Sequence, residues 1–263
     1  MKSVPLNKHS PIPLYYQLVE TLREKIRLGE LKPGEQIPSE RDAAEQYGIS
    51  RMTVRQAILY LIREGHLVAQ HGLGTFVAEP KLAYDPLHLL SFTEEMMRQG
   101  AATTSHVLEQ ILLTPPAPVA KELGLPSHAA TTKIVRLRLS HNVPLLLETV
   151  YVPAGVCPGL EREDLTTHSL YSLLEGKYNL RLSRTRQTLE AISANEYEAE
   201  LFGVTLGAGM LLVEGVTYLD TDRPAEYYKA IYRGDRFKIE LESRRDGWSS
   251  EAVSAPRMSM VLR

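Results

Sequence analysis

The chain has little or none of what defines several large classes of protein. It contains one cysteine, Cys157, in 263 residues, so an intrachain disulfide framework and a cysteine-based metal cluster are both excluded. No apolar run is long enough to cross a bilayer, and Met1 to Pro5 lack the apolar segment of a signal peptide. We therefore expect a cytoplasmic protein in which Cys157 is a small buried side chain.

The residue patterns of common catalytic sites are also missing. The eight histidines show no metal-ligand spacing, no serine stands in a GxSxG context, and no phosphate-binding loop of the P-loop type occurs. The adjacent carboxylates Glu94 and Glu95 fall in a helical run, where we expect them to be solvated. The sequence thus predicts no catalytic residue, no metal site and no cofactor.

A strongly basic surface is absent as well. The formal net charge is −2, with 10 Lys and Arg against 8 Asp and Glu in residues 1–78, and 20 against 24 in residues 79–263. The length favours two domains, and the mild asymmetry assigns any contact with nucleic acid to the first. Such contact would depend on local arginines and on dimerisation.

The stretch from Ile37 to Val77 is the most informative part of the sequence. Ser39 and Asp42 have capping-box spacing, which predicts a helix that Gly48 ends. Ser50 then caps a second helix, whose apolar side chains recur at helical spacing. Two helices joined by a tight turn predict a helix-turn-helix, whose second helix enters the major groove of DNA by its N-terminal end. At that end stand Ser50, Arg51, Met52, Thr53 and Arg55.

Two short strands are expected after Gly65, around the tip His71-Gly72-Leu73-Gly74. From PSER through SRMTVRQAI to GxGTFV, this region resembles the winged helix-turn-helix of the GntR family of bacterial transcription regulators. The resemblance implies that the operator is contacted from the helices and that the wing tip approaches the minor groove. Because the tip carries no Lys or Arg, its grip on phosphate should be weak. The implied DNA-binding residues are Ser39, Arg41, Ser50, Arg51, Met52, Thr53, Arg55, His71, Gly72 and Gly74.

The rest of the chain predicts an α+β domain around a largely antiparallel sheet. We assign residues 1–78 to the DNA-binding domain, 79–90 to a linker with two prolines and no clear period, 91–245 to an effector domain, and 246–263 to a tail of uncertain structure. The expected helices are a first one after Pro13, one after Ser91 with a capping box to Glu94, and others at 119–123, 169–178 and 195–202. Strands are expected at 104–113 and 183–192, and in hairpins 131–139 with 145–152 and 210–219 with 225–233.

This second half resembles the UTRA effector domain of the HutC subfamily of GntR regulators, which has a chorismate-lyase-like fold. The segments that carry the resemblance are SFTEEM, VRLRL, ETVYVP, SLY and EYYKAIYRGDRF, and the similarity is greatest to repressors of N-acetylglucosamine utilisation. The resemblance implies a homodimer that reads a palindromic operator with half-sites of the GT…AC type.

The strand from Lys133 to Leu139 points to an effector site. Its side chains alternate, so Arg136 and Arg138 share one face while Val135, Leu137 and Leu139 pack on the other. Two adjacent guanidinium groups repel each other unless an anion lies between them, or unless a carboxylate such as Glu148 pairs with them. These residues alone leave both alternatives open.

The resemblance favours the anion. In UTRA regulators of amino-sugar metabolism, the matching residues hold a sugar phosphate, with arginines, a serine, a tyrosine and a helix start around the phosphate and acidic residues on the sugar. The leading candidates are N-acetylglucosamine 6-phosphate and glucosamine 6-phosphate, with another phosphosugar such as trehalose 6-phosphate, or a non-sugar metabolite, as alternatives. The effector-binding residues so implied are Ser91, Phe92, Thr93, Arg136, Arg138, Glu148, Ser169, Tyr171, Glu226 and Tyr232.

Three functions are therefore compared. The chain is a ligand-controlled repressor released from DNA by its effector, an enzyme with an appended DNA-binding head, or an architectural DNA-binding protein without a ligand. The missing catalytic patterns argue against the second, and the two arginines on one strand face argue against the third. We predict the first.

Overall fold

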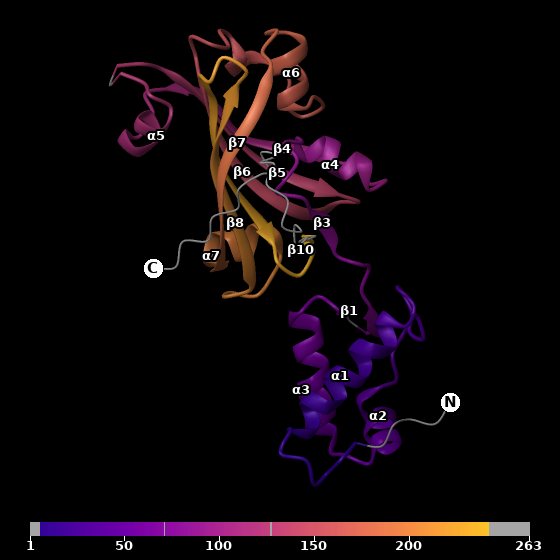
Figure 1. Ribbon diagram of the computed structural model, residues 1–263. Coiled ribbons are helices and arrows are strands. Elements are labelled where there is room, and N and C mark those ends of the chain that lie inside the picture. The colour runs from indigo at the N-terminus through magenta and orange to yellow at the C-terminus, as the bar shows by residue number, and fades with distance from the viewer. Residues whose placement is uncertain (1–5, 71, 127, 242–263) are drawn as a thin grey trace, which may run out of the picture.

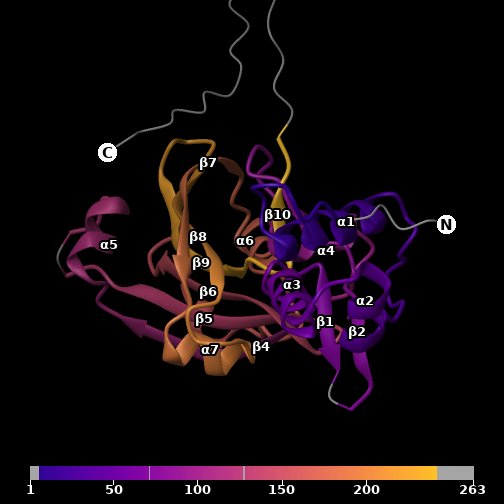
Figure 2. The ribbon, with the colours of Figure 1, turned by 90° about the horizontal axis from the view of Figure 1, so that it is seen from below.

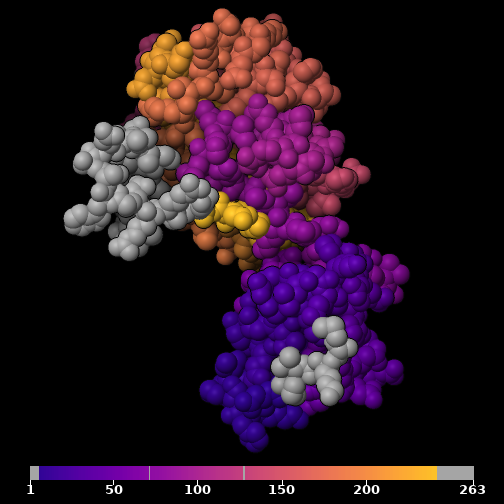
Figure 3. Space-filling view, turned by 45° about the vertical axis from the view of Figure 1, so that its right-hand side comes forward, coloured from indigo at the N-terminus to yellow at the C-terminus, as the bar shows by residue number. Residues whose placement is uncertain are grey.

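The computed structural model describes residues 6–70, 72–126 and 128–241. It has two lobes: a small N-terminal domain of helices and a larger domain built around a sheet (Figure 1). In the space-filling view a narrower region joins them (Figure 3). Among the helices of the described ranges, none is long and apolar enough to cross a membrane.

The N-terminal domain is a winged helix-turn-helix. It contains α1 (Leu14–Arg27), α2 (Glu40–Tyr47), α3 (Arg51–Arg63) and the antiparallel pair β1 (Leu67–Gln70) and β2 (Gly74–Val77). Apolar side chains of all three helices meet in one core, with Leu18, Val54 and Leu61 fully buried. The β1–β2 hairpin extends to one side of the helices (Figure 2).

Two predicted caps begin the helices of this motif. The Ser39 and Ser50 side chains accept hydrogen bonds from the Asp42 and Thr53 N–H groups, at 3.2 and 3.1 Å. The capping box expected at Ser39 is incomplete, because the Asp42 carboxylate accepts a hydrogen bond from the Ser39 hydroxyl at 2.7 Å. Gly48 ends α2 in the left-handed conformation that a glycine adopts at low cost.

The effector domain is built on a six-stranded antiparallel sheet in the order β4-β5-β6-β9-β8-β7, which confirms the predicted α+β class. Its strands are β4 (Thr104–Leu113), β5 (Thr131–Ser140), β6 (Val143–Pro153), β7 (Leu182–Ser193), β8 (Gly209–Leu219) and β9 (Pro224–Arg233). The helices are α4 (Phe92–Arg98), α5 (Ala117–Glu122), η1 (Leu160–Arg162), α6 (Leu170–Gly176) and α7 (Glu196–Phe202).

The first hairpin is tighter than its sequence predicts. His141 and Asn142 alone form the turn, both with positive φ (48° and 61°), which is the backbone of a two-residue type I′ turn. The strands consequently run closer to the turn than residues 139 and 145, and Pro144 lies inside β6 opposite Leu139.

The two faces of the sheet have different coverings. Leu137, Leu139 and Ile231 pack against Phe202 of α7 on one face. On the other face Ile134 and Val150 pack against residues of α6, and Leu146 belongs to a cluster with Met96 of α4. Arg136 and Arg138 share this second face, opposite Leu137 and Leu139, as strand alternation predicts, and line a cavity with residues of α4 and α6.

The linker is more ordered than expected. A short strand, β3 (Leu82–Tyr84), lies in the segment that has no clear period and pairs in parallel with β10 (Phe237–Ile239). This pairing ties the linker to the end of the effector domain. The predicted tail at 246–263 lies outside the described residues.

Candidate DNA interface and effector site

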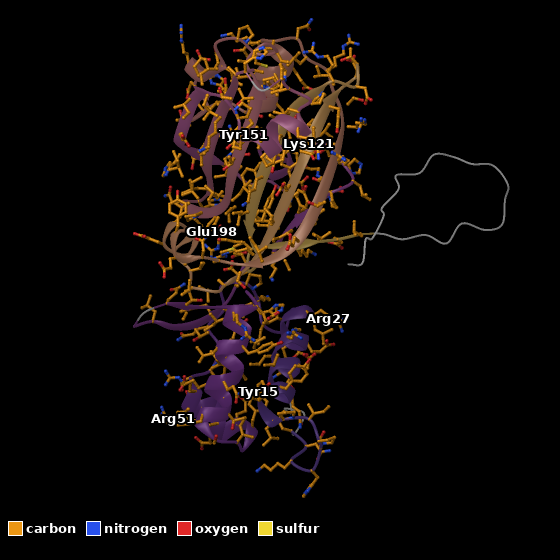
Figure 4. The ribbon with its side chains drawn as sticks, turned by 90° about the vertical axis from the view of Figure 1, so that its left-hand side faces the viewer. Tyr15, Arg27, Arg51, Lys121, Tyr151 and Glu198 are labelled. Carbon is orange, nitrogen blue, oxygen red and sulfur yellow. The ribbon has the colours of Figure 1, made fainter. Side chains whose placement is uncertain are left out.

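The N-terminal turn of α3 presents its side chains to solvent. Arg51 and Arg55 are exposed, Met52 is 71% exposed, and Thr53 is half-buried, whereas Val54 packs in the core. Arg51 lies at the end of the domain away from the effector domain (Figure 4). A surface of this shape and charge suits the entry of α3 into a groove.

Two arginines of this surface make only loose ion pairs. The Arg41 guanidinium lies 3.5 Å from the Asp42 carboxylate, and that of Arg55 lies 4.0 Å from Glu40. Exposed pairs of this kind contribute little to stability, so either side chain can turn toward a phosphate at small cost.

The wing is supported by a residue that sequence patterns miss. Gln36 donates from Nε2 to the carbonyl of Leu73 at 2.9 Å, and its backbone forms an isolated bridge with Phe76. Gly74 has φ of 126°, and a Cβ there would come within 2.4 Å of Gln36 Nε2. Gly72 is exposed with φ of 74°, while His71 lies outside the described residues. The contact spans 37 residues, which no local pattern reveals.

A cavity of about 90 Å³ lies on the arginine face of the large sheet, between α4, α6 and the linker. That is several times the roughly 10–15 Å³ that one water needs, so a small molecule can enter. Nine of the ten residues that the sequence predicts to bind an effector line it, from Ser91 and Phe92 at the start of α4 to Tyr232 on β9. The tenth, Thr93, accepts a hydrogen bond from Arg138 Nη2 at 2.7 Å.

The two arginines share one carboxylate. Arg136 Nη2 and Arg138 Nη1 lie 2.8 and 3.0 Å from the same Glu148 oxygen, and both arginine side chains are almost fully buried. Pairing with Glu148, left open by the sequence, is therefore present, but it balances only one of two positive charges. Among the described residues, no acceptor reaches Arg136 Nε and Nη1 or Arg138 Nε.

The electrostatics of this group are those of a buried cationic site. Burial lowers the pKa of Arg136, and the nearby Arg138 charge lowers it further, against the pull of Glu148. Burial opposes ionisation of Glu148, yet the charges of Arg136 and Arg138 hold its pKa below the ordinary value. Buried donors without acceptors are costly, so the arrangement favours an incoming anion.

A second carboxylate, that of Glu226, has a raised pKa, in contrast to Glu148. Glu226 is 2% exposed and accepts hydrogen bonds from Tyr171 Oη at 2.7 Å and Thr217 Oγ1 at 2.9 Å. Burial raises its pKa to about 7, with the Glu148 charge adding to the rise. Glu226 therefore changes protonation state near neutral pH, inside the cavity.

Several cavity residues were not predicted. The linker contributes Tyr84, Asp85 and His88, and the sheet contributes Gln187 and Tyr228. The alternation from Glu226 to Tyr232 on β9 carries the signal for Tyr228, since 226, 228, 230 and 232 share a face. The linker residues carry no such signal. Their position depends on β3 pairing with a strand more than 150 residues away.

One expectation about this region is wrong. Glu95 is not solvated: it is 7% exposed, lines the cavity, and pairs with Arg98 Nη2 at 3.0 and 3.1 Å. The helical run was predicted correctly, but the sheet buries the side of α4 that carries Glu95. Among the described residues there is no cluster of three or more His, Cys, Asp or Glu able to hold a metal ion. The cavity instead offers guanidinium donors, the carboxylates of Asp85, Glu95, Glu148 and Glu226, and tyrosine hydroxyls, which suit an anion that also carries hydroxyl groups.

Known families match both domains. Residues 14–77 match the gntR family of bacterial regulatory proteins, and residues 98–238 match the UTRA domain. The chain is 39% identical over 232 residues to the HTH-type transcriptional repressor NagR of Bacillus subtilis, covering 88% of this chain and 95% of that one. The chain belongs to the GntR family, in its HutC-type form with a UTRA domain.

Other relatives agree with this assignment. The mannosyl-D-glycerate transport/metabolism system repressor MngR of Escherichia coli is 28% identical, over 89% of this chain and 97% of its own. The crystal structure of PhnF from Mycobacterium smegmatis has a TM-score of 0.60 at 29% identity, covering 86% of this chain and 99% of that one. GntR-family proteins are transcriptional regulators and not enzymes, and this chain is a repressor of that type.

Proposed function

We propose that the protein is a homodimeric repressor of amino-sugar utilisation genes, released from a palindromic operator by N-acetylglucosamine 6-phosphate or glucosamine 6-phosphate. It would act in the cytoplasm, where both operator and effector are found. Similarity to NagR and the resemblance of the cavity residues to those of amino-sugar regulators support the amino-sugar part.

The observation that carries the proposal is the pair of buried arginines. Arg136 and Arg138 share Glu148 and keep N–H groups that no protein acceptor meets among the described residues. A phosphate supplies several anionic oxygens in the geometry that guanidinium groups bind. The hydroxyls of Ser91, Thr93 and Ser169 are the other donors proposed for this end of the effector, while the Tyr171 hydroxyl donates to Glu226.

The sugar would lie toward the carboxylates. Glu148 and Glu226 accept hydrogen bonds from sugar hydroxyls or from the amide, and Tyr232 and Phe92 supply apolar surface. Nothing in this set is specific to one sugar, so trehalose 6-phosphate and other phosphosugars are the alternatives that an experiment has to separate.

The proposed operator contacts come from Ser39, Arg41, the α3 start from Ser50 to Arg55, and the wing at His71, Gly72 and Gly74. One such domain buries little surface on DNA, and two related by a two-fold axis read a palindrome. This is the physical reason for the proposed homodimer and palindrome, and the resemblance to GntR regulators is the reason for proposing half-sites of the GT…AC type.

The test begins with a DNA duplex selected by the purified protein from a random library. Both amino-sugar phosphates, trehalose 6-phosphate and unphosphorylated N-acetylglucosamine are then compared for their effect on the melting temperature and on the affinity for that duplex. We expect an effect from an amino-sugar phosphate and none from the unphosphorylated sugar.

Substitution of the arginines tests the site itself. Arg136→Ala and Arg138→Ala should each abolish the response to the sugar phosphate while duplex affinity stays within about twofold, and the exposed Arg162→Ala is the matched control. A response unchanged in both variants would show that the arginines are structural. A response to trehalose 6-phosphate alone would reassign the effector, and turnover of a sugar phosphate would contradict the proposal.

A further inference from the structure

Gln99, at the C-terminal end of α4, forms two hydrogen bonds with the backbone of the linker, as a neighbouring strand would. The Ala83 N–H donates to Gln99 Oε1 at 3.0 Å, and Gln99 Nε2 donates to the Ala83 carbonyl at 2.8 Å. One side-chain amide thus satisfies both backbone groups of one linker residue, and these groups belong to β3.

Strand geometry explains why those groups are free to pair with a side chain. Successive residues of a strand direct their N–H and C=O groups to opposite sides. The Leu82 N–H donates to the Arg236 carbonyl at 2.8 Å, toward β10, so the backbone groups of Ala83 point the other way. β10 holds the linker strand on one side, and Gln99 holds it on the other.

The same short helix touches the buried Arg138 at its other end. The Phe92 ring centroid lies 5.0 Å from the Arg138 guanidinium carbon, and Thr93 accepts from Arg138. At the C-terminal end, Gln99 Nε2 also donates to Glu95 at 2.6 Å, and Arg98 lies 3.6 Å from Asp85 of the linker. A helix of seven residues spans only about two turns and moves as one body.

We propose that Gln99 is the positioning residue that couples the effector cavity to the linker, and through the linker to the DNA-binding domain. A ligand that changes the position of α4 at the arginines changes the position of Ala83, because the Gln99 amide fixes the two together. Gln99 does not line the cavity, so its part in regulation is separable from effector binding. The inference rests on the proposed function.

The decisive variant is Gln99→Leu, which has nearly the same size and cannot pair with Ala83. The matched control is Gln110→Leu, because Gln110 on β4 also donates its amide to two backbone carbonyls, those of Leu160 and Glu163, at a site away from the linker. The affinity of each protein for glucosamine 6-phosphate and for N-acetylglucosamine 6-phosphate is measured by calorimetry. Its affinity for the selected duplex is then measured in the absence and in the presence of each sugar phosphate.

We expect Gln99→Leu to bind the sugar phosphate and the free duplex within about threefold of the wild type. The factor by which sugar phosphate weakens duplex binding should fall from the 5- to 150-fold typical of allosteric coupling to below about twofold. Gln110→Leu should keep the wild-type factor. Coupling unchanged in Gln99→Leu, or loss of sugar-phosphate binding by it, would overturn the inference. No response in the wild type would overturn the proposed function instead.

Hydrogen exchange on the unmodified protein gives a second test that needs no variant. The Ala83 amide donates to Gln99 and not to β10, so its exchange rate reports on this one contact. We expect saturating sugar phosphate to change that rate severalfold, with a smaller change at Leu82, which donates to Arg236. An unchanged rate at Ala83, in protein shown to bind the sugar phosphate, would contradict the coupling.

Discussion

The incomplete pairing of the buried Arg136 and Arg138 side chains lowers the stability of the folded protein. Two guanidinium groups share one carboxylate, and three of their N–H positions meet no acceptor among the described residues. An apolar core at this place would avoid that cost, since buried charges are stabilising only when fully paired. An anionic ligand that accepts hydrogen bonds from these N–H groups would explain why two arginines stand here.

The arginines at the start of α3, together with Arg41, give a prediction for single residues. Arg51→Ala and Arg55→Ala should each weaken binding to the selected duplex by about 1–3 kcal/mol and relax its sequence preference, as loss of a base contact does. Arg41→Ala should weaken all sequences alike and reduce the salt slope by about one, as loss of a phosphate contact does. Gel-shift titrations at two salt concentrations measure both effects.

The control for this series is Arg63→Ala, at the far end of α3, where the guanidinium lies over the Tyr60 ring and not at the groove end. Its affinity should match the wild type. If Arg51→Ala and Arg55→Ala also match it, α3 does not read DNA through its first turn.

Glu226 predicts a pH dependence of stability. Its pKa in the folded protein is raised to about 7 from an ordinary value of 4.5, so the folded protein binds a proton that the unfolded chain has released. The stabilisation is fully present below pH 4.5 and is lost as the pH rises through 7. The shift corresponds to about 2–4 kcal/mol.

The measurement compares wild type with Glu226→Gln by urea unfolding between pH 4.5 and 8.5. Relative to the variant, the wild type should lose about 2–4 kcal/mol of unfolding free energy across this range. Glu196→Gln, at an exposed position of α7, should follow the wild type. Parallel curves for wild type and Glu226→Gln would show that Glu226 titrates normally.

At the scale of elements, local signals predict most of the fold. Ser39, Ser50 and Ser91 each cap the helix expected to begin after them, and the apolar alternation of β5 locates Arg136 and Arg138 on one face. These features depend on residues within a few positions of each other, where propensity and spacing decide the structure.

Elements that depend on distant partners escape prediction. β3 has three residues between two prolines and exists because β10 and Gln99 satisfy its backbone groups. The burial of Glu95 likewise depends on how α4 packs on the sheet. Both features belong to the candidate site, so the sequence predicts the arginine side of the cavity and misses its linker side.

For the whole molecule, the position of the linker matters more than its composition. The sequence predicts a linker with two prolines and no clear period, but the segment forms a strand, lines the cavity, and holds the Tyr84 hydroxyl 2.9 Å from Gln187. Gln187 also donates to the Pro86 carbonyl and accepts from Tyr228 of the cavity floor. The segment that joins the domains therefore lines the same cavity as the buried arginines.

This separation of sites leads to a prediction about regulation. Arg51, at the start of α3, lies at the end of the N-terminal domain away from the effector domain that contains the cavity (Figure 4), so effector and operator need not compete for a surface. A population shift then requires a complex of protein, DNA and effector, in which each ligand weakens the other by the same factor. Duplex affinity should fall to a plateau as sugar phosphate is added, and calorimetry should find that the duplex weakens sugar-phosphate binding by the plateau factor. Equal sugar-phosphate affinities with and without duplex would exclude coupling. A duplex affinity that falls without limit would indicate competition, and would place the effector on the DNA-binding surface.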